Sequence, residues 1–502
     1  MEIDHDDHHQ DPMSMSAHLH RISRSRMREA FTISMKSALA LLVVAFLSVF
    51  LYTTFSSTNL LLSCPCCDVL PHRITWPANE TDAPTNISHV MFGIGGSVKT
   101  WDTRRHYCEI WWQPKITRGF IWLEESPPNN VSWPVSSPPY RVSTNISQTR
   151  NSSCWYCSRP SIRIARVIKE SFDLGLTNIR WFVMGDDDTV FFTENLLTVL
   201  SKYDHKQKYY IGATSESLDQ NVMHSYRMAY GGGGFAISYP LAAELVKILD
   251  GCISRYAPMY GSDQMVQGCI SEIGVPLTTE LGFHQLDIRK SPYGLLAAHP
   301  LAPLLSLHHL DYVDPLFPST TQQSSLNRLR TAYNLDPGRA LQHTFCHDLT
   351  RNWSISISWG YTIQLYPSLM TANDLEVAPL TFQTWRAWSD GPFTFETRPV
   401  DLNPCQQPVV YFLDGATKAG PSQTLTTYGR HVEEGEKCNL RGYIVAREVK
   451  RFKVSASKLD PKTWTKAPSR ECCEVINARR GTGKVVEVKI RSCNPWESVS
   501  PP

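Results

Sequence analysis

The sequence has little net charge, no internal repeat and no paired cysteine motifs at zinc-binding spacing. Its 49 Lys and Arg residues almost balance its 47 Asp and Glu residues, which leaves a net charge of +2. A chain with this balance has no strong field to attract nucleic acid, and we expect no nucleic-acid partner. Cys154-Trp-Tyr-Cys157 lacks a second Cys pair or a His-x-His partner, so local disulfides are favoured there over a zinc site.

Charged and histidine side chains are also missing from Ser37 to Cys67, and the apolar centre runs over 38–55. This stretch is long enough to cross a bilayer as a helix. A cleaved signal peptide is the alternative, but the stretch begins late and no clear cleavage site follows it. Basic residues precede the stretch and Asp68 is the first charge after it, which predicts a cytosolic N-terminus and a luminal body.

Cysteines and glycosylation sequons agree with a luminal body. The 14 cysteines are spread along the chain, as is typical of a protein from an oxidising compartment. Every N-x-Ser/Thr sequon lies after the apolar stretch, with the acceptors Asn79, Asn86, Asn130, Asn145, Asn151 and Asn352.

The pattern of apolar segments predicts two folded regions behind the anchor. Strand-like and helix-like segments alternate over 89–250, which predicts an α/β domain with a largely parallel sheet. Polar and apolar residues alternate over 352–359 and 393–397, and together with the segments 409–412 and 486–490 they predict a β-rich C-terminal domain. The predicted order is cytosolic tail, anchor, stem, catalytic domain, linker and C-terminal domain, at 1–36, 37–58, 59–85, 86–315, 316–345 and 346–502.

The strongest chemical signal is the acidic triplet Asp186-Asp187-Asp188, which follows the apolar strand 179–184. Ligands of open α/β sheets bind outside the carboxyl ends of the strands. Adjacent carboxylates repel unless a cation lies among them, and Mg²⁺ and Mn²⁺ prefer oxygen ligands. Asp186 and Asp188 can therefore share one face of a metal–diphosphate unit, while Asp187 points away and holds the loop. A solvated acidic turn is the structural alternative.

Several motifs together resemble the fringe-like β-1,3-glycosyltransferases, and most closely their plant fringe-related group. The matching segments are 180–190 (RWFVMGDDDTV), 228–238 (MAYGGGGFAIS), 260–266 (YGSDQMV), 282–287 (GFHQLD) and 305–311 (LSLHHLD). The resemblance covers about residues 86–315. It implies a GT-A fold with a Rossmann-like mixed sheet, a UDP-sugar donor, Mn²⁺ (or Mg²⁺) and inversion at the anomeric carbon.

The resemblance also assigns roles to single residues. It implies Asp263 as the general base, for which an ordinary helix N-cap is the alternative. It implies Asp188 and Asp186 as metal ligands, with His284 as the late histidine ligand. Further histidine candidates are His299, His308 and His309. Donor contacts are implied for Asp186, Asp187, Gly232 and Gly233, and for either Arg104 or Arg105. Ser262 stands where the family often has a second acid.

We therefore predict a Golgi, single-pass type II glycosyltransferase. It transfers a hexose or N-acetylhexosamine from UDP to a glycan or glycoprotein hydroxyl, with a β-1,3 linkage. A non-catalytic lectin-like or scaffold protein that kept the fold is the alternative, and binding of UDP with Mn²⁺ distinguishes the two. A metal-dependent hydrolase would need a second carboxylate pair that the sequence does not offer. The sugar, the acceptor and the oligomeric state stay open.

Overall fold

The computed structural model describes residues 41–48, 50, 83–128, 132–145, 158–432, 438–476 and 484–501. The chain divides into two compact units, residues 1–78 and 79–502. In the first unit, residues 41–48 are helical. Within the described ranges, no helix has both the length and the apolar character that spanning a bilayer requires. Most of the predicted anchor, the stem and the Cys154–Cys157 pair lie outside these ranges.

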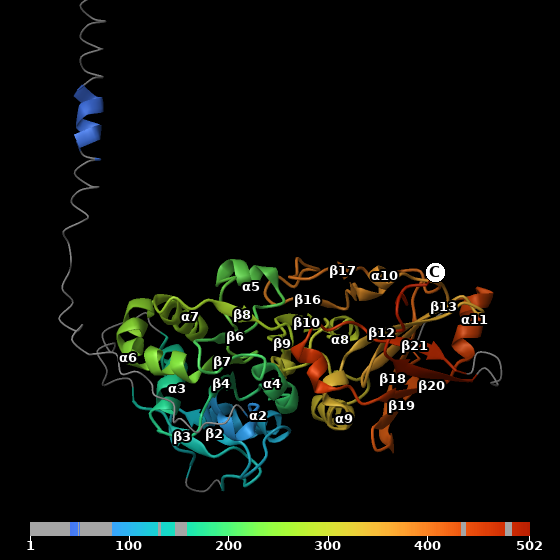
Figure 1. The fold of residues 1–502 in the computed structure, drawn as a ribbon, viewed down its shortest axis with the longest axis horizontal. Helices are drawn as coiled ribbons and strands as arrows, with labels where there is room; N and C mark the ends of the chain where they lie inside the picture. Colours follow the sequence, from blue (N-terminus) through green and yellow to red (C-terminus); the bar gives the residue numbers. More distant parts are fainter. Residues whose placement is uncertain are drawn as a thin grey trace, which may run out of the picture. The chain divides into compact units, whose positions relative to one another are not determined.

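A seven-stranded sheet forms the centre of the α/β region in the second unit (Figure 1). Its strands in spatial order are β3 (Tyr140–Val142), β2 (Arg118–Leu123), β1 (Val90–Gly95), β4 (Trp181–Asp186), β7 (Phe235–Ser238), β6 (Tyr210–Gly212) and β8 (Leu277–Thr279). The pairs on either side of β1 are parallel, whereas β7 runs antiparallel to both β4 and β6. The predicted mixed sheet is confirmed, with β3 as an additional strand inside the predicted loop 124–153.

Helices α3 (Arg159–Phe172), α6 (Tyr239–Tyr256) and α7 (Ser262–Glu272) lie together beside this sheet (Figure 1). Helix α3 buries Ile162, Ala165 and Ile168, the helical spacing that predicted it, in a core shared with α6 and α7. The disulfide Cys252–Cys269 ties α6 to α7. The remaining helices of the region are α2 (Val98–Glu109), α4 (Thr193–Leu200), α5 (Leu218–Met223) and α8 (Tyr293–Ala297).

A small second sheet lies next to the acidic triplet. Its strands are β5 (Val190–Phe191), β11 (Ser306–Leu307) and β9 (Phe283–His284), in that order. Strand β11 runs parallel to β9 and antiparallel to β5. These pairings bring the motifs at 180–190, 282–287 and 305–311 together in space.

The C-terminal region is built on an eight-stranded sheet, so the predicted β-rich character is confirmed. In spatial order its strands are β12 (His343–Asp348), β13 (Trp353–Ser358), β14 (Thr362–Tyr366), β18 (Val409–Gly420), β19 (Gln423–Arg430), β20 (Arg451–Ser457), β22 (Val485–Arg491) and β21 (Cys472–Val475). Shorter elements are β10 (Ile288–Lys290), β15 (Ala378–Pro379), β16 (Phe382–Thr384), β17 (Thr397–Arg398), α10 (Ala372–Glu376) and α11 (Arg441–Glu448).

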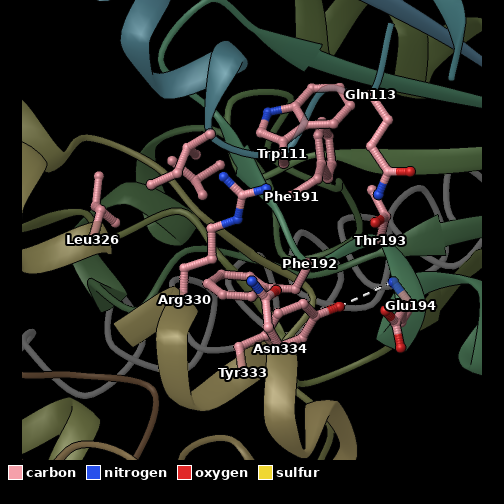
Figure 2. A pocket seen from close by; sticks show the side chains of 12 residues that line it. Trp111, Gln113, Phe191, Phe192, Thr193, Glu194, Leu326, Arg330, Tyr333 and Asn334 are labelled. Atoms are coloured by element: carbon pink, nitrogen blue, oxygen red, sulfur yellow. Dashed lines mark hydrogen bonds between the residues drawn. The ribbon is translucent and has the colours of Figure 1, made fainter. Parts of the chain in front are cut away.

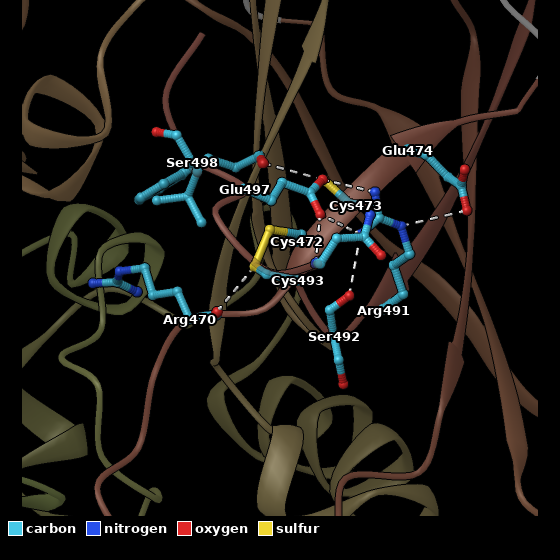
Figure 3. The surroundings of a disulfide bond; sticks show 12 residues. Arg470, Cys472, Cys473, Glu474, Arg491, Ser492, Cys493, Glu497 and Ser498 are labelled. Carbon is cyan, nitrogen blue, oxygen red and sulfur yellow. Dashed lines mark hydrogen bonds and ion pairs between the residues drawn. A yellow bond between two sulfur atoms is a disulfide. The ribbon is translucent and has the colours of Figure 1, made fainter. Parts of the chain in front are cut away.

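Disulfides tie the ends of this sheet together. Cys346 of β12 pairs with Cys473 of β21, so the two edge strands of the sheet are linked to each other. The neighbouring Cys472 pairs with Cys493, beyond the end of β22 (Figure 3). Neighbouring residues of a strand point to opposite faces, which is why adjacent cysteines have partners on different sides. The third pair in this region is Cys405–Cys438.

Helix α9 (Gln322–Leu335) occupies the predicted linker and joins the two regions. Its Tyr333 hydroxyl accepts a hydrogen bond from the backbone N–H of Glu194 at 3.0 Å, at the start of α4 (Figure 2). Helix α4 has no side-chain cap of its own, and the tyrosine satisfies part of its free N-terminus. One continuous apolar core includes residues of β1 and residues of β22, so both regions fold around the same interior.

Candidate active site

The acidic triplet lies where the sequence places it, at the carboxyl end of β4. The hydroxyl of Thr189 accepts a hydrogen bond from the Asp186 N–H at 2.8 Å and donates one to the Gly232 carbonyl at 2.7 Å. Thr189 is fully buried, and its backbone carbonyl accepts from the indole of Trp111. These contacts fix the acidic turn against the glycine-rich segment 231–234.

Asp186, Asp188 and His308 form one group that can hold a cation. One ligand atom from each of them lies within 4.8 Å of the other two. His308 Nε2 is 3.1 Å from Asp188 Oδ1 and 3.9 Å from Asp186 Oδ2. His308 Nδ1 faces the Gln285 carbonyl at 3.3 Å, which orients the ring with Nε2 toward the carboxylates. A second hydrogen bond of this kind is typical of metal-binding histidines.

The donor set fits a divalent cation. Asp188 Oδ1 is buried and accepts no hydrogen bond of good geometry, although His308 Nε2 is close. Two atoms that lie close together without a well-aligned hydrogen bond can both point at a cation between them. Two carboxylates and one imidazole suit Mn²⁺ well, and they leave coordination positions open for phosphate oxygens.

The pKa shifts of Asp186, Asp188 and His308 show that this group of side chains favours the binding of positive charge. Burial raises the pKa of Asp186 to about 7, and the charge of Asp188 adds to that rise. Burial alone would raise the pKa of Asp188 too, but His308 and Arg104 hold it below its usual value. Burial lowers the pKa of His308, yet the two carboxylates outweigh it and raise that pKa to about 9. A divalent cation would displace the His308 proton, as metals do when they bind.

Arg104 and Asp187 hold helix α2 against the acidic turn. The Arg104 guanidinium lies 3.2 Å from Asp187 Oδ1 and 3.2 Å from Asp188 Oδ2. The second carboxylate oxygen of Asp187 accepts hydrogen bonds from the Ser97 N–H and the Thr100 hydroxyl near the start of α2. Asp187 therefore turns away from the cation group, in keeping with the expectation that it holds the loop.

Asp263 lies at the start of α7 and faces the glycine-rich segment. Its Oδ2 accepts from the Gly231 N–H at 3.0 Å, and its Oδ1 accepts from the Ser262 hydroxyl at 2.9 Å. The N-cap of α7 is Gly261, and Asp263 makes no capping hydrogen bond. Burial raises the pKa of Asp263. Asp186 and Asp263 line the same narrow cavity, together with Gly231.

Comparisons with known proteins show which families and proteins the chain is similar to. The family described as "Fringe-like" matches residues 139–293, and the family described as "Protein of unknown function, DUF604" matches residues 220–473. Mouse "Beta-1,3-glucosyltransferase" is 29% identical over 168 residues, which are 33% of this chain and 32% of the mouse protein. The human protein of that name is 30% identical over 137 residues, 27% of this chain and 25% of its own length. The chain belongs to the DUF604 family, which matches half of its length, and its residues 139–293 are similar to the Fringe-like family. The matches span about a third or less of the length of these curated relatives.

In this fringe-like chain, His308 rather than His284 joins the two aspartates. His284 Nδ1 lies 3.2 Å from Glu216 Oε1, and His284 Nε2 lies 3.0 Å from His299 Nε2. Both ring nitrogens of His284 are thus engaged with residues outside the cation group. His308 follows directly after the short strand β11, which lies between β5 and β9 and so places it at the acidic turn.

Of the two candidate arginines, only Arg104 faces the acidic turn. Arg105 Nη1 is 3.0 Å from Glu109 Oε1 on the same helix, and Glu109 also accepts hydrogen bonds from the hydroxyls of Ser136 and Ser137. The Arg104 guanidinium instead forms ion pairs with carboxylates, including that of Asp311 at 3.4 Å. A direct contact of Arg104 with a nucleotide stays a prediction.

The glycine-rich segment supports the site from beneath. A side chain at Gly231 would meet the Asp263 carboxylate, and one at Gly232 would meet the His308 ring. The Gly233 N–H donates to Gln285 Oε1 at 2.6 Å. Gly232 and Gly233, the two predicted donor contacts, are both buried. The segment therefore packs closely against Asp263 and His308 and is not a loose connector.

Gly232→Ala should weaken metal binding without unfolding the protein. The added methyl group forces the His308 ring out of reach of Asp188, while the backbone angles at this position suit alanine. We expect the Mn²⁺ affinity, measured by titration in the presence of UDP, to fall about tenfold or more, as it does when the support of a metal ligand is removed. Gly442→Ala on α11 is the control, since nothing lies near that position. Equal Mn²⁺ affinity of the wild type and Gly232→Ala would exclude His308 as a ligand.

Sequence reasoning missed two supporting residues that lie in the quoted motifs. The Gln285 side chain accepts a hydrogen bond from the Gly233 N–H, and its backbone carbonyl contacts Nδ1 of the His308 ring. Asp287 accepts a hydrogen bond from the Ser215 hydroxyl at 2.6 Å and lies 3.0 Å from His309 Nδ1. Polar residues beside the apolar Phe283 and Leu286 were a usable signal, since buried polar side chains need partners.

Proposed function

We propose that this protein transfers a hexose or N-acetylhexosamine from a UDP-sugar to a hydroxyl of a glycan or glycoprotein, with inversion and a β-1,3 linkage. The observation that carries the proposal is that Asp263 lines the same narrow cavity as Asp186, a member of the Asp186–Asp188–His308 group. The activity for which the mouse and human relatives are named supports the linkage.

In this proposal the cation group binds the donor. Asp186, Asp188 and His308 would hold Mn²⁺, which supplies positive charge to the diphosphate of the leaving nucleotide. Before the metal binds, Arg104 and the protonated His308 keep Asp188 ionised, because both place positive charge beside its carboxylate. Thr189 holds the turn in position, so the carboxylates need not rearrange when the donor binds.

Asp263 is the proposed general base. Inversion requires a carboxylate that accepts the proton of the acceptor hydroxyl while its oxygen attacks the sugar from the face opposite the leaving group. The Gly231 N–H and the Ser262 hydroxyl fix the orientation of this carboxylate. Its raised pKa makes it a better proton acceptor than an exposed aspartate.

Residence in the Golgi membrane is part of the same proposal. It is supported by the charge-free stretch after Ser37, the basic residues that precede it and the sequons that follow it. Among the described sequons, Asn86, Asn145 and Asn352 are exposed, as a glycan acceptor must be.

A donor screen tests the proposed activity. The purified full chain, with a panel of UDP-sugars and Mn²⁺, should release UDP from one donor faster than from the others, and chelation of Mn²⁺ should stop the release. UDP-glucose is the first donor to test, because the named relatives are glucosyltransferases. A protein that neither hydrolyses any donor nor binds UDP with Mn²⁺ in calorimetry would be a scaffold or lectin instead.

A further inference from the structure

Asp263 also lines a second cavity, of about 250 Å³. It is lined by residues of the fringe-like region and by Trp385 and Arg386 of the C-terminal region. Trp385 and Arg386 lie outside residues 139–293, which match the Fringe-like family, and inside the DUF604 match. This wall of the cavity therefore lies outside the fringe-like match.

Buried polar atoms without partners gather around this cavity. The Tyr230 hydroxyl, Gln220 Nε2 and Gln264 Oε1 are all buried, and none of these atoms makes a hydrogen bond within the structure. All three side chains line the cavity. Unpaired buried polar atoms cost free energy, and a ligand that pairs with them removes this cost. One donor, one acceptor and one hydroxyl that can do both match a ligand rich in hydroxyl groups.

The Trp385 segment is held firmly at the cavity wall. The Trp385 ring stacks on His309 with an angle of 2° and a centroid distance of 4.2 Å, and the Arg289 guanidinium lies 3.8 Å from its centroid. Its backbone N–H donates to the Ser217 hydroxyl, and the preceding strand β16 pairs with β10. Arg386 is exposed beside it, with its guanidinium over the Tyr260 ring.

The cavity suits one sugar ring. Its volume is below the about 300–1,000 Å³ of pockets for drug-sized ligands, so it takes a monosaccharide unit better than a longer chain. Asp263 borders both this cavity and the narrow one that contains Asp186. A base that accepts a proton from the acceptor must touch the acceptor, so a cavity that Asp263 lines is a candidate place for the acceptor.

We propose that Tyr230, Gln220 and Gln264, together with Arg386 of the C-terminal region, form the subsite for the acceptor monosaccharide. This inference rests on the proposed transferase function, and it gives the C-terminal region a role in acceptor selection. The expected ligand is a pyranose with free hydroxyl groups, one of which points at Asp263.

Ligand-observed NMR on the full chain tests the subsite. With UDP and Mg²⁺ present, the methyl β-glycosides of glucose, galactose and N-acetylglucosamine are titrated, and at least one should bind. Tyr230→Phe and Arg386→Ala should each weaken that binding about fivefold or more, the effect of one lost hydrogen bond. Tyr230→Phe removes only a hydroxyl that has no partner in the fold, so the melting temperature should not fall. Tyr226→Phe and Arg441→Ala, both outside the cavity lining, are the matched controls.

The outcomes separate this inference from the proposed function. Binding of UDP without binding of any glycoside, or glycoside binding that neither variant changes, overturns the subsite and leaves the transferase proposal standing. Glycoside binding that both variants weaken, in a chain that does not bind UDP, supports the subsite and overturns the transferase proposal.

Discussion

Asp188→Asn should lower the rate of sugar transfer about 10³-fold or more. The substitution removes the buried carboxylate that faces both His308 and Arg104, and with it the charge that attracts the cation. Metal stabilisation of a leaving group contributes several kcal/mol, and each 1.4 kcal/mol is a factor of ten in rate. The measurement is transfer or donor hydrolysis at saturating UDP-sugar over a range of Mn²⁺ concentrations.

Asp186→Asn provides the companion variant, because Asp188→Asn also removes a carboxylate that both Arg104 and His308 contact and can weaken the fold. The raised pKa of Asp186 means that folding disfavours its charged form. The resulting loss of folding stability grows as the pH rises from the ordinary carboxyl range to about 7, and it is fully present above that pH. At pH 7.5, Asp186→Asn should therefore lose activity while its melting temperature stays equal or rises. Asp173→Asn, an exposed carboxylate on the far end of α3, is the control. Full activity of either Asp186→Asn or Asp188→Asn would refute the metal-site assignment.

Asp263→Asn should lower kcat about 10²–10⁴-fold while UDP and Mn²⁺ still bind. General-base catalysis has this magnitude, and asparagine keeps the shape and the hydrogen bond from Gly231 but cannot accept the proton. The measurement pairs steady-state kinetics with calorimetric titration of UDP in the presence of Mn²⁺.

This split between rate and affinity distinguishes a base from a structural aspartate. A structural role would lower the melting temperature and the UDP affinity together with the rate. Asp219→Asn, in the first turn of α5, is a matched change near the start of another helix. If Asp263→Asn transferred sugar at the wild-type rate, the base would have to be another residue, and Asp287 is the nearest carboxylate lining the same cavity.

Much of the α/β region could be predicted from local patterns. The burial of β4 follows from its apolar run, and α3 follows from the spacing of Ile162, Ala165 and Ile168. The antiparallel direction of β7 could not be predicted, because strand direction depends on connections and pairing partners and not on composition. Strand β3 was missed for a related reason, since its residues are exposed and sit in a segment rich in Pro and Ser.

The candidate site shows the same division between local and non-local information. The carboxylate triplet was found because its three members are adjacent in the sequence. The choice between His284 and His308 depends on which way each ring points. His284 lies in the two-residue strand β9 and His308 directly follows the two-residue strand β11, and such short strands have too little periodicity to show the direction of a side chain. The cavity beside Asp263 was out of reach altogether, because one of its walls comes from a segment more than a hundred residues later.

The adjacent cysteines of β21 impose an order on oxidative folding. Cys472 closes a loop of 21 residues with Cys493, whereas Cys473 must close one of 127 residues with Cys346. Loop-closure entropy favours the shorter loop by roughly 1.6 kcal/mol. The local bond can therefore form first and leave a single thiol for the long-range partner. An exchange of the two neighbours would shift β21 by one residue and turn the buried Cys472 outward, and thiol–disulfide exchange is the reaction that can correct such a pairing.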